Sequence, residues 1–392
     1  MCSKKNPPMN FDLSPEQQMI KDTVRDFVDK EVIPSAREND LKEKFPYELL
    51  KKMAPLGLLG APITLEYGGT GLDYISHAII TEEIGRGCSS LRTTLSVQIS
   101  LVELTILKWG TEEQKRKYLP KLCKGEMLGC FGLTEPEAGS DASNQSTTAV
   151  LKGNEWIING AKIWISNGTV ADIAIVFAQT DKSKKHKGIA AFLVEKGIKG
   201  FKANKITGKL GLHSSDTGEL VFEDCRVPKK SILGQVGDGF KIAMFALDNG
   251  RYSVAAGCVG IIQGCLDACV KYAKQRQQFG KPIGGFQLIQ EKIAKMAVDL
   301  DAGRLLVYRA GHLKNKGIKN TTETSMAKLY ASEAAVSAAS EAIQIHGAYG
   351  YSNEYPIERY YRDAKVATIY EGTSEIQKLI IAGNILGIKA FV

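Results

Sequence analysis

The apolar residues of this chain change their spacing twice, and this change limits the fold more than any other sequence feature. They recur at helical intervals in the first third and again from Gly239 onward, whereas residues 147–228 hold short runs rich in Val, Ile, Phe and Trp. At 392 residues the chain is long enough for two or three domains. We therefore expect an α+β protein with a helical domain over residues 1–128, a β domain over 129–236 and a helical bundle over 237–392.

Helix-start signals mark the first domain. Residues 14–17 form a capping box with proline at the first helical position, and the apolar spacing after them predicts a helix that ends at Pro34. Residues 74–86 and 95–109 are expected to form buried helices, and a second capping box at Thr111 precedes a short basic helix.

The middle domain is expected to be a compact antiparallel β barrel or sandwich. Its apolar runs are bounded by turn residues such as Asn159-Gly160. The candidate strands are residues 156–158, 162–166, 173–179, 189–194 and 219–223. No long helical pattern separates them, so parallel crossovers are not expected. The last domain then contains long helical stretches that suit an antiparallel bundle. These are residues 240–275, 287–316, 322–346 and 374–386.

Composition and charge exclude several protein classes. The formal net charge of +8 suits a phosphate-bearing ligand but lacks the dense basic stripe of a nucleic-acid binder. The first ten residues lack the apolar run of a signal peptide, and the apolar stretch 252–270 is interrupted by Asp267 and glycines. We therefore expect a cytoplasmic protein without a membrane span. The eight cysteines and five histidines are scattered without metal-ligand spacing, so no metal site is expected.

Standard motifs are missing from the sequence. No G-x-G-x-x-G follows a strand, and Phe240 stands where a phosphate loop starting near Gly234 would need a lysine. The G-x-S-x-G and H-E-x-x-H motifs of common hydrolases and zinc proteases are also absent.

Three stretches nevertheless have compositions that are unusual for purely structural segments. Residues 131–141 offer hydroxyls and backbone to a flat heterocycle or a phosphate, and a structured interdomain loop explains them equally well. Trp164 and Ser166 share one face of a strand end, which would serve either ring stacking or a core. Residues 276–282 combine an arginine with an aromatic residue, which suits a dinucleotide or simply a cationic helix end.

A fourth stretch, residues 370–377, places Glu371 just before the helix cap Thr373 in a mostly apolar segment. Partial desolvation there would raise the pKa of this carboxyl toward that of a useful general base. Many surface helices also begin with an acidic residue near the cap, so this pattern alone leaves both interpretations open.

Taken together and in this order, these stretches resemble the acyl-CoA dehydrogenase family. The likeness extends over about residues 13–386 and includes the segments LTEPEAGSD, WISNG, RQQFGKP, QIHGAYGY and YEGTSEIQ. The resemblance implies an N-terminal helical domain, a middle β domain and a C-terminal four-helix bundle. It also implies an FAD-dependent enzyme, usually a homotetramer, that oxidises an acyl-CoA thioester to the 2-enoyl-CoA.

The family's reaction implies a role for Glu371. In the family a glutamate removes the α-proton, flavin N5 receives the β-hydride, and fixed donors stabilise the charge on the thioester oxygen. Glu371 matches that base. Some branches carry the base immediately before the position of Arg251, where this chain has Gly250, so Glu371 is the only family-matched base.

The resemblance implies further site residues. Contacts to the isoalloxazine ring match Phe131, Leu133, Thr134, Trp164 and Ser166. Contacts to the adenine dinucleotide, some made across a subunit interface, match Arg276, Gln278, Phe279, Gln344 and Gly347, while Thr373 and Glu375 match contacts within the same subunit. Substrate positions match Ser140, Asp248, Arg251 and Gly372. Ala348 departs from the glycine that usually follows Gly347.

The acyl group is expected to be short, branched or alicyclic, with a dicarboxylic group as the alternative. Residues 89–98 resemble the glutaryl-CoA branch, in which the arginine matched by Arg92 binds the distal carboxylate. That branch tends to carry a glutamate seven positions earlier, where this chain has Gly85. An interhelical or surface ion pair is the other explanation of Arg92.

The expected partners are the acyl-CoA substrate and an electron-transfer flavoprotein or an equivalent acceptor. Two other roles remain open: a flavin-bearing subunit of an electron-transfer complex, and a silent CoA-binding scaffold. The presence of Glu371 argues against the scaffold.

Overall fold

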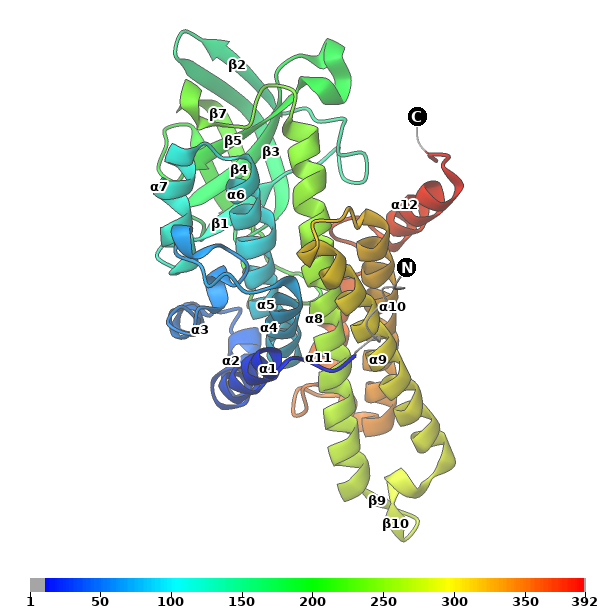
Figure 1. The fold of residues 1–392 in the computed structure, drawn as a ribbon. Helices are drawn as coiled ribbons and strands as arrows, with labels where there is room; N and C mark the ends of the chain where they lie inside the picture. Colours follow the sequence, from blue (N-terminus) through cyan, green and yellow to red (C-terminus); the bar gives the residue numbers. More distant parts are fainter. Residues whose placement is uncertain (1–10, 391–392) are drawn as a thin grey trace.

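The computed structural model describes residues 11–390, which form three consecutive parts around a long central helix (Figure 1). The first part contains the helices α1 Pro15–Phe27, α2 Ile33–Leu41, α3 Tyr47–Met53, α4 Tyr74–Gly87, α5 Ser89–Ser96, α6 Leu104–Trp109 and α7 Glu112–Cys123. The α+β architecture and the chain order of helices, sheet and helices agree with the prediction. The predicted properties of the chain's first ten residues lie outside the described part.

The first helix begins as predicted but does not end at Pro34. The Ser14 hydroxyl accepts a hydrogen bond from the backbone N–H of Gln17 at 3.2 Å, and the Gln17 side chain accepts one from the Ser14 N–H. After α1 a π-helical segment, Val28–Val32, leads directly into α2. Pro34 lies in the first turn of α2 and does not end the helical path. The predicted end was therefore wrong.

A second π-helical segment lies in the molecular core. It spans Val97–Glu103 between α5 and α6, and all of its residues are buried. The predicted helix over 95–109 therefore begins earlier, at Ser89, and includes an irregular middle. Wider π-turns re-aim side chains and often occur at functional sites.

The middle part is one twisted sheet whose strands run in the order β6-β7-β3-β2-β4-β5-β8, with β1 beside β4. The strands are β1 Gly129–Gly132, β2 Thr148–Lys152, β3 Glu155–Ser166, β4 Ile173–Gln179, β5 Ile189–Glu195, β6 Phe201–Lys205, β7 Thr217–Pro228 and β8 Ile232–Leu233. Most pairs are antiparallel, as expected, but β1 is parallel to β4, with Gly129 opposite Ile173. No crossover helix is needed for this pair because β2 and β3 form the connection between its strands.

Asn159-Gly160 does not form the predicted turn. The two runs around it belong to the single strand β3, and a register shift against β7 lies between Ile158 and Gly160. Gly160 has φ +140°, and a Cβ there would lie 2.6 Å from the Thr147 hydroxyl oxygen. The dipeptide is therefore a β-bulge, in which glycine allows a close backbone approach.

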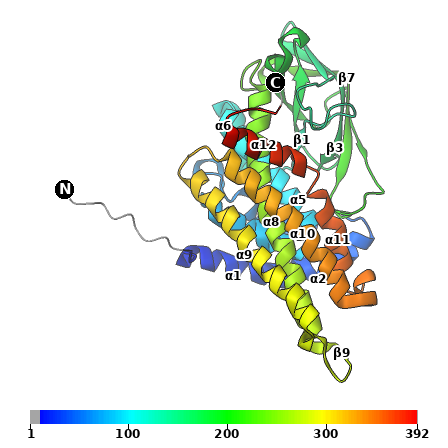
Figure 2. The ribbon, with the colours of Figure 1, turned by 90° about the vertical axis from the view of Figure 1, so that its right-hand side faces the viewer.

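The last part is a helical bundle built on α8 Gly239–Gln275. It also contains α9 Gln287–Asn315, α10 Thr321–His346, α11 Ile357–Val366 and α12 Ser374–Leu386, and a small hairpin of β9 Gln277–Gln278 and β10 Lys281–Pro282 joins α8 to α9. Helix α11 was not predicted from the sequence. Figures 1 and 2 show α8 running from the sheet down the bundle, between the N-terminal helices and the pair α9 and α10.

Helix α8 is the only described helix long and apolar enough to cross a membrane, but 72% of its most apolar window is buried inside the protein. It therefore serves as the core helix of the bundle. The seven described cysteines are buried free thiols, while Cys2 lies outside the described residues.

Candidate active site

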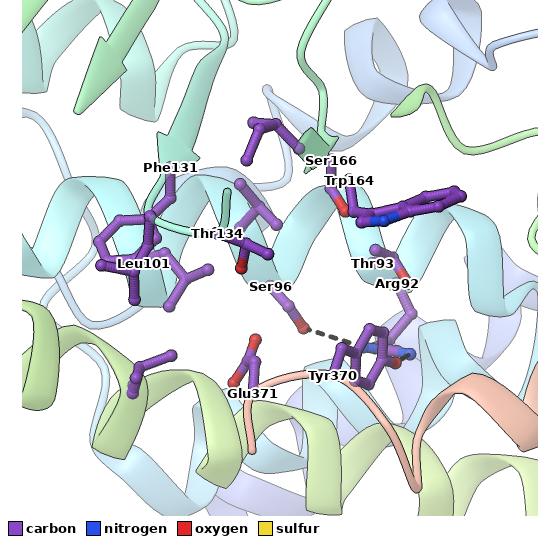
Figure 3. A pocket seen from close by; sticks show the side chains of 14 residues that line it. Arg92, Thr93, Ser96, Leu101, Phe131, Thr134, Trp164, Ser166, Tyr370 and Glu371 are labelled. Atoms are coloured by element: carbon purple, nitrogen blue, oxygen red, sulfur yellow. Dashed lines mark hydrogen bonds between the residues drawn. The ribbon is translucent and has the colours of Figure 1, made fainter. Parts of the chain in front are cut away.

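A pocket of about 120 Å³ lies where the three parts of the chain meet (Figure 3). One wall comes from α5 and the π-helical segment after it, and a second comes from the ends of β1 and β3. Leu247 on α8 also lines the pocket, and Tyr370 and Glu371 in the loop before α12 close it from below in the view of Figure 3. Residues distant in sequence therefore meet in one cavity.

Glu371 lies in this pocket, and its carboxylate points up toward Ser96 and Thr134 (Figure 3). The carboxylate atom Oε2 is buried and has no hydrogen-bond partner within residues 11–390. A Cβ added to Gly250 would overlap this Oε2 and lie 2.6 Å from the carboxyl carbon. The two positions at which family members carry the base thus share one space, and Gly250 leaves it to Glu371.

The surroundings of Glu371 bring its pKa close to neutral pH. Burial raises the pKa of Glu371 to about 7, while the nearby cations Arg92, Arg251 and Lys328 act in the opposite direction. A carboxyl with a pKa near neutrality is suited to proton abstraction, because both of its forms are accessible at the working pH.

The backbone around Glu371 is held by buried donors. The Arg251 guanidinium donates from Nε to the Glu371 carbonyl oxygen at 3.0 Å and forms an ion pair with Asp248 at 2.9 Å. Arg251 is 4% exposed, so within this chain its polar atoms bond to the loop and to Asp248 rather than to solvent. Gly372 follows with φ +90°, and Thr373 caps α12 by accepting from the Ile376 N–H at 3.3 Å.

Arg92 is a buried cation in the same pocket. The residue is 1% exposed, and its guanidinium donates to the Tyr370 hydroxyl at 2.6 Å. Its Nε has no hydrogen-bond partner, and no carboxylate of residues 11–390 lies within ion-pair distance of it. The ion pair considered from the sequence is therefore not formed.

The position seven residues before Arg92 cannot supply a side chain in this packing. A Cβ on Gly85 would lie 2.7 Å from the carbonyl oxygen of Gly257, because α4 and α8 approach closely there. Neither a glutamate nor any other counterion reaches Arg92 from that turn of α4.

The opposite wall carries the residues predicted to hold a flat ring: Phe131, Leu133, Thr134, Trp164 and Ser166. A register shift between Lys162 and Ile165 breaks the alternation of β3, and Trp164 has φ +62°. Trp164 and Ser166 both line the pocket, although the physical reason is this irregularity rather than a regular strand face. The Trp164 side chain is 59% exposed, so the pocket wall offers an open aromatic face.

The predicted dinucleotide contacts lie elsewhere in the chain. Gln278 and Phe279 belong to the β9–β10 hairpin at the end of the bundle remote from the sheet (Figure 1), and Phe279 is 93% exposed. The Arg276 guanidinium lies 5.9 Å from the ring centre of Tyr349, which follows Gly347 at the exposed end of α10. Arg276, Gln278, Phe279, Gln344 and Gly347 make up a group of exposed residues, none of which lines the pocket of its own chain.

The remaining predicted residues surround the pocket less closely. Ser140 and Glu375 are exposed, and Asp248 is half-buried and accepts from the Thr321 hydroxyl at 2.7 Å. Thr93, Ser96 and Leu101 also line the pocket, although they were not predicted as site residues. Thr93 and Ser96 lie in the stretch 89–98 that resembles the glutaryl-CoA branch, whereas Leu101 lies within the π-helical segment and no motif marked it.

Comparisons with known proteins agree with this architecture. Family models match three consecutive segments: "Acyl-CoA dehydrogenase, N-terminal domain" over residues 14–126, "middle domain" over 130–225 and "C-terminal domain" over 237–386. The short-chain specific acyl-CoA dehydrogenase of Clostridium acetobutylicum is 47% identical over 96% of this chain and 100% of its own length. The glutaryl-CoA dehydrogenase of Desulfococcus multivorans is 47% identical over 97% of this chain and 99% of its own length.

Solved structures show the same fold. A chain in the structure of the electron transferring flavoprotein of Acidaminococcus fermentans is 48% identical, with a TM-score of 0.95 over 96% of this chain and 100% of that chain. A glutaryl-CoA dehydrogenase from Mycobacterium smegmatis in complex with FADH2 is 36% identical, with a TM-score of 0.93 over 97% of each chain. The chain described here belongs to the acyl-CoA dehydrogenase family. It is an oxidoreductase of the flavoprotein class that acts on acyl-CoA thioesters.

Proposed function

We propose that this protein dehydrogenates a short dicarboxylic acyl-CoA of the glutaryl-CoA type, with Glu371 as the base and Arg92 as the ligand of the distal carboxylate. The observation that carries the proposal is the buried Arg92 guanidinium, which lines the pocket beside Glu371 without a carboxylate partner in the described chain. A short monocarboxylic acyl-CoA is the second candidate, because relatives of both kinds are equally similar to this chain.

The energetics of Arg92 favour the dicarboxylic substrate. Burying a guanidinium costs several kcal/mol unless charged or polar groups compensate it, and within the described chain Arg92 has only the neutral hydroxyls of Tyr370, at 2.6 Å, and Ser96, at 3.5 Å. A substrate carboxylate would supply the missing charge and could accept two parallel N–H bonds from the planar fork of Arg92. A monocarboxylic acyl chain would leave the guanidinium with these two neutral hydroxyls as its only partners.

Glu371 would remove the proton from the α-carbon of the thioester. Its raised pKa, which comes mainly from burial, matches that task. The bound FAD would supply the hydride acceptor and would itself be reduced, so that one proton and one hydride leave the acyl chain as its double bond forms. Gly372 and the Glu371 backbone N–H belong to the held loop that would orient the thioester oxygen.

The residues present fit such a flavin. The open indole face of Trp164 suits a flat aromatic ring, and the hydroxyls of Thr134 and Ser166 supply donors on the same wall. The exposed group at the far end of the bundle would contact the adenine dinucleotide bound to a neighbouring subunit, which requires an oligomer, in our proposal a homotetramer. An electron-transfer flavoprotein or an equivalent protein would reoxidise the flavin.

The test uses the purified flavin-loaded protein and anaerobic bleaching of its flavin by glutaryl-CoA and butyryl-CoA. We expect faster bleaching by glutaryl-CoA. Arg92→Met should abolish that preference while the butyryl-CoA rate stays within a few-fold of wild type. Glu371→Gln should retain the flavin and lose about 10³-fold or more in rate with both substrates.

A wild-type preference for butyryl-CoA that Arg92→Met leaves unchanged would move the assignment to the monocarboxylic candidate. Full activity of a flavin-loaded Glu371→Gln variant would contradict the assigned base.

A further inference from the structure

Three buried side chains converge on the carbonyl groups of the base and of the residue after it. Lys328 Nζ donates to the Gly372 carbonyl oxygen at 2.8 Å. Gln377 Nε2 donates to the same oxygen at 2.9 Å and to that of Glu371 at 3.2 Å, and Arg251 adds its bond to the latter. These donors come from α10, α12 and α8 and fix the loop from three sides.

The loop needs such support because its backbone is strained. Glu371 has φ +55°, in the left-handed region, and Gly372 has φ +90°. A non-glycine residue in this region is strained and persists only where surrounding contacts determine the conformation. The three donors supply those contacts, and they thereby set the direction in which the Glu371 side chain leaves the backbone.

A buried lysine is an unusual donor to a neutral backbone carbonyl group. Its residue is fully buried on α10, its bonded partner is a neutral carbonyl, and no carboxylate of residues 11–390 lies within ion-pair distance. Burial lowers the pKa of Lys328 to about 8, which shows how poorly its charge is solvated. A neutral amide would hold the Gly372 carbonyl at lower cost, so the charge itself requires an explanation.

The charged groups around Glu371 provide an explanation for the charge of Lys328. Besides Lys328, the cations that act on it are Arg92 from α5 and Arg251 from α8. Arg251 has its own carboxylate in Asp248, and in the proposed function Arg92 would be neutralised by the substrate. Lys328 would then be the cation that keeps its full effect on Glu371 during turnover.

The other titratable groups near Lys328 do not take over this role. Cys258 on α8 and Glu375 on α12 act on Lys328 from the remaining sides. Burial raises the pKa of the Cys258 thiol to about 11, so it is neutral under ordinary conditions, and Glu375 is exposed to solvent.

We propose that Lys328 is a positioning residue for the catalytic base: its ammonium holds the Gly372 carbonyl, and its positive charge keeps the buried Glu371 carboxylate ionised. This inference rests on the proposed role of Glu371 as the base. Lys328 makes two separate contributions: its hydrogen bond fixes the geometry of the loop, and its positive charge favours the ionised form of Glu371.

The experiment compares Lys328→Met, which lacks both contributions, Lys328→Gln, which retains a donor, and Lys328→Arg, which retains the charge. The pH dependence of kcat, which reports groups in the enzyme–substrate complex, is measured with the flavin-loaded proteins and the best acyl-CoA substrate. In Lys328→Met and Lys328→Gln the midpoint of the acidic limb should move up by about one pH unit. Lys328→Arg should keep the wild-type midpoint, and the high-pH rate of Lys328→Gln should exceed that of Lys328→Met.

Lys314→Met is the matched control. Lys314 on α9 is another lysine whose pKa burial lowers to about 8, but it donates to the Asn249 side chain and is not among the cations acting on Glu371. Its loss should leave the midpoint in place.

A second readout needs no turnover. Because burial raises the folded-state pKa of Glu371 above its ordinary value of 4.5, its ionisation costs stability. The Tm of wild type relative to Glu371→Gln should fall as the pH rises through that range and level off near pH 7. Without Lys328 the fall should continue to higher pH.

Unshifted midpoints in both Lys328→Met and Lys328→Gln, or an equal shift in Lys328→Arg, would overturn the proposal and leave Lys328 a purely structural residue. If Lys328→Met does not fold, Lys328→Gln and Lys328→Arg still decide the effect of the charge. Absence of turnover in the wild type would count against the proposed function instead, and the thermal comparison would still test Lys328.

Discussion

At the scale of single residues, the Glu371 carboxylate occupies the volume that a side chain at position 250 would need. A Cβ at position 250 would lie within 3 Å of all three atoms of that carboxyl group. The helix itself would accept alanine there, because alanine stabilises a helix interior by about 1 kcal/mol relative to glycine. A substitution at Gly250 should therefore disturb the base more than the fold.

We predict that Gly250→Ala retains its flavin and lowers the rate of flavin reduction by at least about tenfold, because the carboxyl group must leave its position. Gly303→Ala on α9 is the control, since the nearest atom to its new Cβ is 3.3 Å away and belongs to a side chain outside the pocket. Equal rates in the two variants would show that Glu371 accommodates the methyl group.

At the scale of secondary-structure elements, the bulge in β3 shows how one glycine determines strand registration. Gly160 combines φ +140° with close contacts to Thr147, so alanine there meets both backbone strain and a steric clash. Gly153, in the turn between β2 and β3, has φ +61°, but a Cβ added there would have no neighbouring atom within 4 Å. Comparing alanine variants at Gly153 and Gly160 therefore separates the effect of backbone strain from that of the steric clash.

Gly153→Ala should lower the free energy of unfolding by about 1 kcal/mol through strain alone. Gly160→Ala should lower it by about 3 kcal/mol or more, since the Thr147 backbone must also move. Urea unfolding of the flavin-loaded protein measures both values, and similar losses would mean that the strand relaxes around the added methyl group.

The elements with simple periods were predictable, and the irregular ones were not. The capping boxes at Ser14 and Thr111 and the long helices after Gly239 appear where local patterns place them. The two π-helical segments and the bulge at Gly160 depend on packing against other parts of the chain, which no local pattern encodes.

At the scale of the whole molecule, Asp363 lies at a junction of the three parts. It is 2% exposed on α11, and its carboxylate accepts from the Leu212 backbone N–H at 2.6 Å, in the loop before β7. Asp40 of α2 lies close enough to oppose its ionisation. Burial, followed by this neighbouring charge, raises the pKa of Asp363 to about 6 from an ordinary value of 3.8.

The raised pKa of Asp363 determines how the stability of the protein changes with pH. Because the folded-state pKa is raised, the protein loses stability as the pH rises from about 4 to about 6, and the loss stays constant above this range. We predict that Asp363→Asn, which keeps an acceptor for Leu212, is more stable than wild type at neutral pH by up to about 3 kcal/mol and equally stable near pH 4. The exposed Asp301→Asn is the control, and a gain that does not change with pH would contradict the prediction.

Sequence alone determined the order of helical and β parts, the family, and the residues that could carry the chemistry, because helical period, turn residues and long motifs are properties of neighbouring positions. Tertiary structure alone decided that Arg92 is buried without a carboxylate, that Gly250 makes room for Glu371, and that Lys328 lies beside the base. Each of these depends on helices far apart in the chain packing together, and the burial that this packing produces sets both the available space and the cost of every charge.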